Sequence, residues 1–273
     1  RVTRQEATRY ATLCSPDTLV NSLRRAMIGC ADNILVTSLR EGRNREIAGM
    51  IENNKTYSWW SREHRPYTLA EVIADGVVHV LGLIVAISAG AVLLAFAIME
   101  TAPELPALAL YVGSLIAVLG VSLAYNLWPV SPVKKLLARF DQAAIFLFMA
   151  GSYTPFLAVI GGTTSGTLMT TFVWGASLIG IALKLIVPEH FGRLAIALYL
   201  AIGWSGILVF QSLAQTLPSS TMLLLLAGGV TYSLGIIFHL WEKLKFQNAL
   251  WHVFVVCGAS LHLWAVIDFI HRV

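Results

Sequence analysis

The side chains in this sequence that can do chemistry are a few acids, histidines and a serine within apolar segments. Asp141 opens the stretch 139–160, and His252 lies near the start of the last apolar stretch. A carboxylate beside membrane hydrocarbon costs roughly 2.5 kcal/mol or more, so such an acid is a candidate functional residue. Carboxylate and imidazole are also zinc ligands, and a catalytic zinc site needs about three protein ligands plus water. Asp141, His252 and, from the first apolar segment, His79 are the candidate zinc ligands.

Other polar residues lie at similar distances from the ends of their apolar segments. Glu71, Asp75 and His79 follow one another at intervals of four, so they share one face of a helix. This common depth on several helices favours one pocket. The predicted pocket residues are Glu71, Asp75, His79, Ser122, Tyr125, Asn126, Asp141, Asn248 and His252.

Each of these residues also has a simpler explanation. The helix dipole favours an acid at a helix start, so Asp141 and Glu71 can be solvated charges at the membrane interface. Asn126 and Asn248 can join helices by hydrogen bonds without forming a site. Ser122 has no evident His–Asp dyad that would make it a nucleophile.

Seven apolar segments position these side chains. The 273-residue chain is 57% hydrophobic and 12% charged, with a mean hydropathy of +0.72, whereas soluble domains carry about 25% charged residues. Segments of about twenty residues span a bilayer core of about 30 Å, and in lipid they must be helical to pair their backbone groups. Residues 67–273 are therefore predicted to form an all-α integral membrane bundle. Its seven transmembrane helices are predicted at 71–98, 107–128, 140–160, 167–187, 193–213, 219–241 and 249–270.

The basic residues predict the orientation of the bundle. With seven helices, eighteen of the nineteen Lys and Arg residues lie on one side of the membrane and only Arg272 on the other. Because cytoplasmic loops carry the excess of Lys and Arg, the N-terminus is predicted to be cytosolic and the C-terminus outside. The pocket residues then lie in the cytosolic half of the membrane.

Residues 1–66 differ in composition from the rest of the chain. They are polar and hold eleven of the nineteen Lys and Arg residues. We expect a cytosolic, poorly ordered tail, with a helix on the membrane surface as the lesser alternative. No nucleic-acid partner is expected, because the basic residues lie in flanks and loops. Cys14, Cys30 and Cys257 form no CxxC pair, which argues against a disulfide framework or a thiolate zinc site.

Several motifs, in order along the chain, resemble those of the bacterial hemolysin III proteins. These proteins are the prokaryotic side of the progestin and adipoQ receptor family, and the resemblance covers residues 67–270. The motifs are EVIADGVVHVLG at 71–82, SLAYN at 122–126, RFDQAAIFLFMAGSYTPF at 139–156, WGASLIGIALKL at 174–185, YLAIGW at 199–204, GGVTYSLGIIFH at 228–239 and NALWHVFVVCGASLHLWAV at 248–266.

The resemblance implies seven helices with a cytosolic N-terminus and a zinc site on the cytosolic side. Ser122, Asp141 and His252 match the family pattern, but Asn126 and Asn248 occupy positions where family members have zinc-binding histidines. Asn does not replace imidazole as a zinc ligand. We therefore expect a weak or absent zinc site, with a hydrogen-bonded network in its place.

The resemblance also implies a location and a set of functions. We expect a multi-pass protein of a bacterial inner membrane that contacts membrane lipids and senses lipid or maintains membrane state. The family name adds cytolytic or channel activity. The alternative is a zinc-dependent, ceramidase-like hydrolase of lipid amides, in which zinc activates water. The missing histidines count against this alternative, and the sequence does not predict the oligomeric state.

Overall fold

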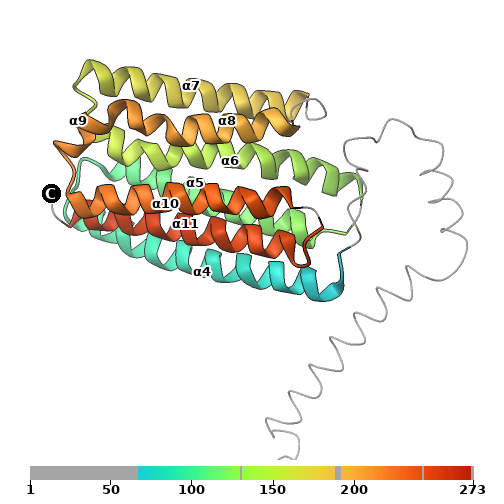
Figure 1. The fold of residues 1–273 in the computed structure, drawn as a ribbon. Coiled ribbons are helices and arrows are strands. Elements are labelled where there is room, and N and C mark those ends of the chain that lie inside the picture. The colour runs from blue at the N-terminus through green and yellow to red at the C-terminus, as the bar shows by residue number, and fades with distance from the viewer. Residues whose placement is uncertain (1–66, 130, 188–191, 242, 272–273) are drawn as a thin grey trace, which may run out of the picture. The chain divides into compact units, whose positions relative to one another are not determined.

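The computed structural model describes residues 67–129, 131–187, 192–241 and 243–271, and it contains no strand within these ranges. Seven helical segments of the described chain are long and apolar enough to cross a membrane, which confirms the predicted all-α bundle of seven spans. Six spans are single helices and the fifth is built from three pieces (Figure 1). The single helices are α4 (Leu69–Met99), α5 (Leu105–Leu127), α6 (Pro132–Val159), α7 (Thr164–Ile186), α10 (Ser219–Leu240) and α11 (Gln247–Ile270).

Local capping explains where several of these helices begin. The Thr68 side chain accepts from the backbone N–H of Glu71, and the Glu71 carboxylate accepts from the backbone N–H of Thr68, which is a capping box. Ser131 caps α6 directly before Pro132, and proline favours the first turn of a helix. Helix α6 therefore begins eight residues before the predicted apolar segment, because its polar first turn lies outside the hydrophobic run.

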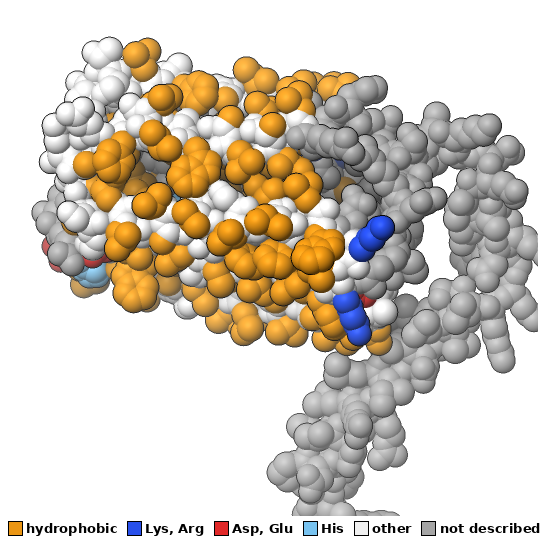
Figure 2. Space-filling model, viewed as in Figure 1, with side chains coloured by type: hydrophobic (Ala, Val, Ile, Leu, Met, Phe, Trp, Pro, Cys, Tyr) orange, Lys and Arg blue, Asp and Glu red, His pale blue; other side chains and the backbone are white. Residues whose placement is uncertain are grey.

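The helices form a bundle in which segments from the two ends of the described chain pack together. Helix α4 packs against both α5 and α11, α6 packs against α5 and α7, and α10 packs against α11. Small residues allow close approach: a Cβ on Gly90 would lie 2.6 Å from the Val112 side chain. Hydrophobic side chains cover the outer face seen in Figure 2, as expected for a surface that contacts lipid.

The fifth span is interrupted, although the sequence predicted one continuous helix at 193–213. It consists of α8 (Gly192–Trp204), the 3₁₀ turn η2 (Ser205–Val209) and α9 (Phe210–Ala214). The Tyr153 hydroxyl on α6 accepts from the backbone N–H of Gly206 at 2.9 Å and donates toward the carbonyl oxygens of Ile202 (2.9 Å) and Gly203 (2.7 Å). A break in a transmembrane helix persists only where the freed backbone groups find such partners.

Some sequence predictions fall outside what these residues test. The expected tail 1–66, with Cys14 and Cys30, lies outside the described residues, whereas Cys257 is described as a free, exposed thiol. The orientation of the bundle in the membrane stays a prediction. Helices α4, α6 and α11 begin, and α5 ends, at the same end of the bundle (Figure 1).

Candidate functional site

Helix α4 supplies three of the predicted pocket residues from one buried face. Glu71 and Asp75 are each 3% exposed and His79 is 0% exposed. Their spacing of four residues places them one turn apart along the helix. The three do not share one role, however, because their contacts differ.

The carboxylate of Glu71 bonds to backbone groups at the starts of two helices. One carboxylate oxygen completes the capping box of α4, and the other accepts from the backbone N–H of Phe246 at 2.8 Å. Phe246 has a φ of 60° and directly precedes α11. Glu71 therefore joins the starts of α4 and α11, and it is not among the residues that line the cavity described below.

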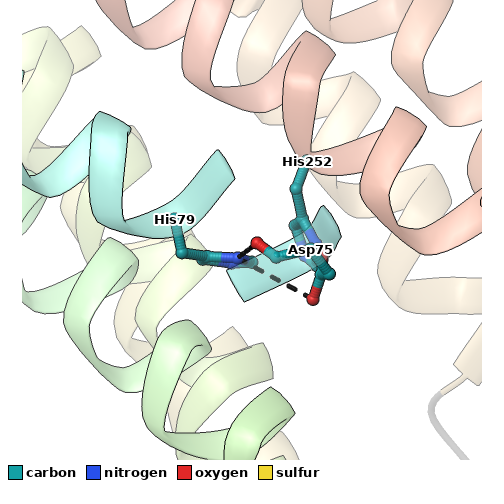
Figure 3. Close-up of side chains that lie close together, drawn as sticks. All are labelled: Asp75, His79 and His252. Carbon is teal, nitrogen blue, oxygen red and sulfur yellow. Dashed lines mark hydrogen bonds and ion pairs between the residues drawn. The ribbon is translucent and has the colours of Figure 1, made fainter. Parts of the chain in front are cut away.

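Asp75 orients an imidazole on a distant helix. Its Oδ1 atom lies 2.6 Å from Nδ1 of His252, which is on α11 and 8% exposed (Figure 3). A carboxylate only accepts, so Nδ1 carries the hydrogen and the second ring nitrogen of His252 is left for other chemistry. Carboxylate–histidine pairs of this kind fix the tautomer and orientation of functional imidazoles.

His79 is held between its own helix and α5. Its Nδ1 lies 2.9 Å from the carbonyl oxygen of Asp75, and its Nε2 lies 3.0 Å from the Ser122 hydroxyl. Because the carbonyl only accepts, Nδ1 carries the hydrogen, and in the neutral ring Nε2 is an acceptor. Ser122 therefore has an imidazole partner, but the other ring nitrogen of that imidazole bonds the main-chain carbonyl of Asp75 and lies 3.8 Å from its carboxylate.

The two asparagines that replace expected histidines contact each other. Asn248 Nδ2 donates to Asn126 Oδ1 at 2.9 Å and to Asp75 Oδ2 at 3.1 Å. Asn126 Nδ2 in turn donates to the carbonyl oxygen of Ser122 at 2.9 Å. A hydrogen-bonded network thus joins α4, α5 and α11; it shares Ser122, Asn126, Asn248 and His252 with the expected one but has Asp75 and His79 as further members in place of Asp141. Its members are Asp75, His79, Ser122, Asn126, Asn248 and His252, called the polar network below.

Asp141 and Tyr125 lie beside this network. Asp141 on α6 is half-buried, interacts with Ser122 and is close enough to His252 and Asp75 for electrostatic interaction. Tyr125 is half-buried beneath the ammonium group of Lys134, which lies 5.2 Å from its ring centroid. Only Asp141 of these two faces the cavity described next, so Tyr125 is a neighbour of the site and not part of its wall.

A cavity of about 170 Å³ lies between six of the helical segments, namely α4, α5, α6, α8, α10 and α11. For scale, an engineered apolar cavity of about 150 Å³ admits benzene. His79, Ser122, Asp141 and His252 form its polar end. The remainder of the wall is mostly apolar and aromatic, including Phe148, Met149, Trp204, Tyr232 and Trp251. Sequence reasoning missed this aromatic wall, because hydropathy gives no signal for the direction in which a helix face points.

The residues that could hold a metal differ from the predicted set by one acid. Possible ligand atoms of Asp75, His79 and His252 all lie within 4.8 Å of one another (Figure 3). The predicted set had Asp141 in place of Asp75. Asp75 and His79 are engaged in hydrogen bonds within the protein. Two imidazoles and one carboxylate can bind a metal, so these three residues form a possible metal-binding cluster.

The fold and the site define a multi-pass membrane protein whose transmembrane helices enclose a cavity with one polar end. A family model described as Haemolysin-III related matches residues 68–263. The chain belongs to the haemolysin-III related family, which confirms the resemblance seen in the sequence motifs.

Relatives from bacteria and animals agree with this assignment. The chain is 33% identical to "Hemolysin-3" of Bacillus cereus over 201 residues, which cover 73% of this chain and 92% of that protein. It is 32% identical to the "Hemolysin-3 homolog" of Bacillus subtilis over 210 residues, or 76% of this chain and 98% of that protein. The human "Monocyte to macrophage differentiation factor" is 29% identical over 133 residues, or 48% of this chain and 55% of that protein.

Proposed function

We propose that this protein binds a membrane amphiphile in its cavity and so senses lipid in a bacterial inner membrane. The observation that carries the proposal is the asymmetry of the cavity wall. One end presents His79, Ser122, Asp141 and His252, whereas the wall beyond them is mostly apolar. A polar head group bound at the polar end places the first carbons of its alkyl chain against the aromatic side chains, where burial of apolar surface favours them. A cavity of about 170 Å³ holds only this first part of a long chain.

The charges at the polar end favour an uncharged or cationic head group. Asp141 faces the cavity, Asp75 contacts the wall residue His252 at 2.6 Å, and the described residues of the wall include no Lys or Arg. An anionic head group would meet like charge there, and like charges repel strongly where water is scarce. A long-chain amine or alcohol fits this polar end better than a fatty acid.

Binding of matched amphiphiles tests the proposal. Trp204 and Trp251 line the cavity, so their fluorescence reports occupation of the purified protein in nanodiscs. We expect hexadecylamine to bind more tightly than palmitate. Because a hydrogen bond to a charged group contributes about 1.5–3 kcal/mol, Asp141→Asn should weaken amine binding about 10-fold or more.

The matched control is Asp268→Asn, which changes an acid near the C-terminal end of α11 and outside the cavity wall. It should leave amine affinity unchanged. Equal affinity for amine and palmitate, or unchanged affinity in Asp141→Asn, would contradict the proposal.

The second candidate function is zinc-dependent hydrolysis of a lipid amide, favoured by the proximity of Asp75, His79 and His252. A bound zinc would supply an activated water. Turnover of a fluorescent lipid amide with added zinc, lost in Asp141→Ala, would replace the binding function with an enzymatic one. Absence of turnover together with amine binding supports the binder.

The names of the bacterial relatives suggest channel or cytolytic activity for those proteins. This activity requires a different structural feature from amphiphile binding. A conducting path needs polar groups or water along the whole span. In the described chain the polar network occupies one end, and the cavity wall beyond it is mostly apolar, with scattered polar side chains such as Ser152, Ser233 and His262. Ion flux from reconstituted liposomes would support this activity, and flux unchanged by Asp141→Asn would separate it from the amphiphile site.

A further inference from the structure

A serine and a histidine at the polar end of the cavity are placed as a nucleophile and its base. Ser122 Oγ on α5 lies 3.0 Å from Nε2 of His79 on α4. A hydroxyl becomes an effective nucleophile when a base within about 2.6–3.2 Å takes its proton and a third group orients that base. The distance between Ser122 and His79 meets the first of these two conditions.

Asp75 supplies the third group. Its main-chain carbonyl oxygen lies 2.9 Å from Nδ1 of His79, which fixes the hydrogen on Nδ1 and makes Nε2 the acceptor in the neutral ring. Its carboxylate Oδ2 lies 3.8 Å from the same nitrogen (Figure 3). When His79 takes a proton, the positive charge on its ring therefore lies beside a buried acid, and this attraction is strong where water is scarce.

Ser122 has surface that is open to the cavity. The residue lines the cavity wall and is 6% exposed, whereas His79 is 0% exposed. A helical backbone is enclosed by the side chains around it, and a serine side chain consists only of Cβ and Oγ. The exposed surface of Ser122 therefore belongs to its hydroxymethyl group, which a molecule in the cavity can reach.

His252 on α11 offers a second open polar atom beside this pair. Its ring contacts the His79 ring, with the centroids 4.2 Å apart. Nδ1 of His252 bonds to Asp75, and in the described part of the chain Nε2 has no hydrogen-bond partner and keeps accessible surface. The carboxylate at 2.6 Å stabilises the imidazolium form, which carries a hydrogen on Nε2 as well. Such a donor stabilises negative charge that develops on a substrate oxygen.

Asp141 is a second acceptor near the Ser122 hydroxyl, but it is the weaker base. It interacts with Ser122 and faces the cavity. Imidazole is a stronger base than a carboxylate, so the proton of Ser122 passes to His79 when the hydroxyl attacks a substrate. Asp141 has a separate effect on the product, because a carboxylate formed in the cavity meets like charge there and is released.

We propose that Ser122 is the nucleophile of a metal-independent cleavage of carboxylic esters whose acyl chain lies in the cavity. His79 Nε2 takes the proton as Ser122 Oγ bonds to the carbonyl carbon, and the leaving alcohol oxygen takes that proton as the ester C–O bond breaks. Water then attacks the acyl-serine, its proton passes through His79 to Oγ, and the acid leaves. The net reaction converts ester and water into acid and alcohol. This activity goes beyond the binding of an amphiphile.

An alkyl fluorophosphonate tests whether Ser122 is activated. This probe forms a stable bond to the oxygen of an activated serine with loss of fluoride. The purified protein in nanodiscs is treated with the probe in the presence of EDTA, and peptide mass spectrometry locates the label. We expect the label on Ser122. Loss of a general base costs about 100-fold or more in rate, so His79→Gln should slow labelling by at least about that factor.

A matched serine of the same cavity is the control. Ser152 lines the wall but donates to the carbonyl oxygen of Met149 at 2.9 Å and has no imidazole partner. Ser152→Ala should therefore leave the rate of labelling at Ser122 unchanged. Ester cleavage is measured separately as hexanoate released from ethyl hexanoate, whose short acyl chain suits a cavity of about 170 Å³. Release should persist in EDTA and be lost in Ser122→Ala.

Several results would overturn the proposal. Absence of label from Ser122 in the unaltered protein would refute the nucleophile, and this result does not depend on whether any variant folds. Labelling that requires added zinc would refute metal independence, and labelling without release of hexanoate would refute the ester cleavage. Loss of labelling in Asp141→Asn, with labelling kept in His79→Gln, would make Asp141 the base. Hexadecylamine binding is measured independently, so each of these failures leaves the amphiphile site standing.

Discussion

Two aspartates near opposite ends of the bundle show how one residue type serves two purposes. Asp75 on α4 contacts His252 and Asn248 on α11, residues more than 170 positions away in the sequence. Asp268, near the end of α11, accepts from Ser220 at 2.6 Å and from Thr221 at 2.7 Å. Both hydroxyls belong to the first turn of α10, the helix directly before α11 (Figure 1). One acid therefore orients an imidazole beside a cavity, and the other fastens two consecutive helices together.

The difference lies in what stands behind each acid. The partners of Asp268 include two hydroxyls that can turn toward backbone carbonyls when the acid is removed. The partners of Asp75 are the imidazole of His252, which lines the cavity, and the amide of Asn248, which also contacts Asn126. Losing Asp75 disturbs a site, whereas losing Asp268 loosens a helix pair. Three predictions test this contrast.

The largest expected effect is conversion of the polar end into a zinc site. Asn126 and Asn248 face each other at 2.9 Å beside Asp75, so imidazoles at both positions would complete a histidine-rich donor set. We expect Asn126→His/Asn248→His to hold about one zinc per chain, measured by elemental analysis, and the unaltered protein to hold far less. Asn126→Gln/Asn248→Gln is the control. One tightly bound zinc per chain in the unaltered protein would overturn the description of this end as a hydrogen-bonded network.

A smaller effect is expected from Asp75→Ala. The change leaves His252 and Asn248 without their acceptor in a buried site, which costs about 3 kcal/mol. For a domain of this size the melting temperature should fall by roughly 10 °C. Thermal unfolding in detergent measures the shift, and Asp75→Asn, which keeps an acceptor oxygen, should lose less. An Asp75→Ala protein as stable as the unaltered one would show that the network contributes no stability.

The smallest effect is expected from Asp268→Ala. Hydrogen bonds between membrane helices contribute on average about 0.6 kcal/mol, so the loss of stability should be about 1 kcal/mol. Hexadecylamine should bind as before, because Asp268 lies outside the cavity wall. A loss of amine binding in this variant would erase the distinction between the two acids.

The sequence was sufficient for the seven spans and for the α4 face, because segment length and spacing of four residues depend only on local geometry. It was not sufficient to assign roles. Asp75, predicted only as a pocket residue, proved to orient His252, whereas Glu71 proved to cap a helix. Hydropathy reports how deep a residue lies but not which way its helix is rotated. The Tyr153 contacts that permit the broken fifth span are equally invisible, since they join residues about fifty positions apart.

That broken span also bears on how quickly an occupant exchanges. Helix α8 packs sparsely against its neighbours and is tied to them by neutral hydrogen bonds, from Tyr199 to the carbonyl of Gln142 and from Trp204 to Ser233. Segments with few contacts open at the lowest free-energy cost. If an amphiphile occupies the cavity as proposed, we expect α8 to open first when it enters or leaves, because the polar network joins α4, α5 and α11 and does not include α8.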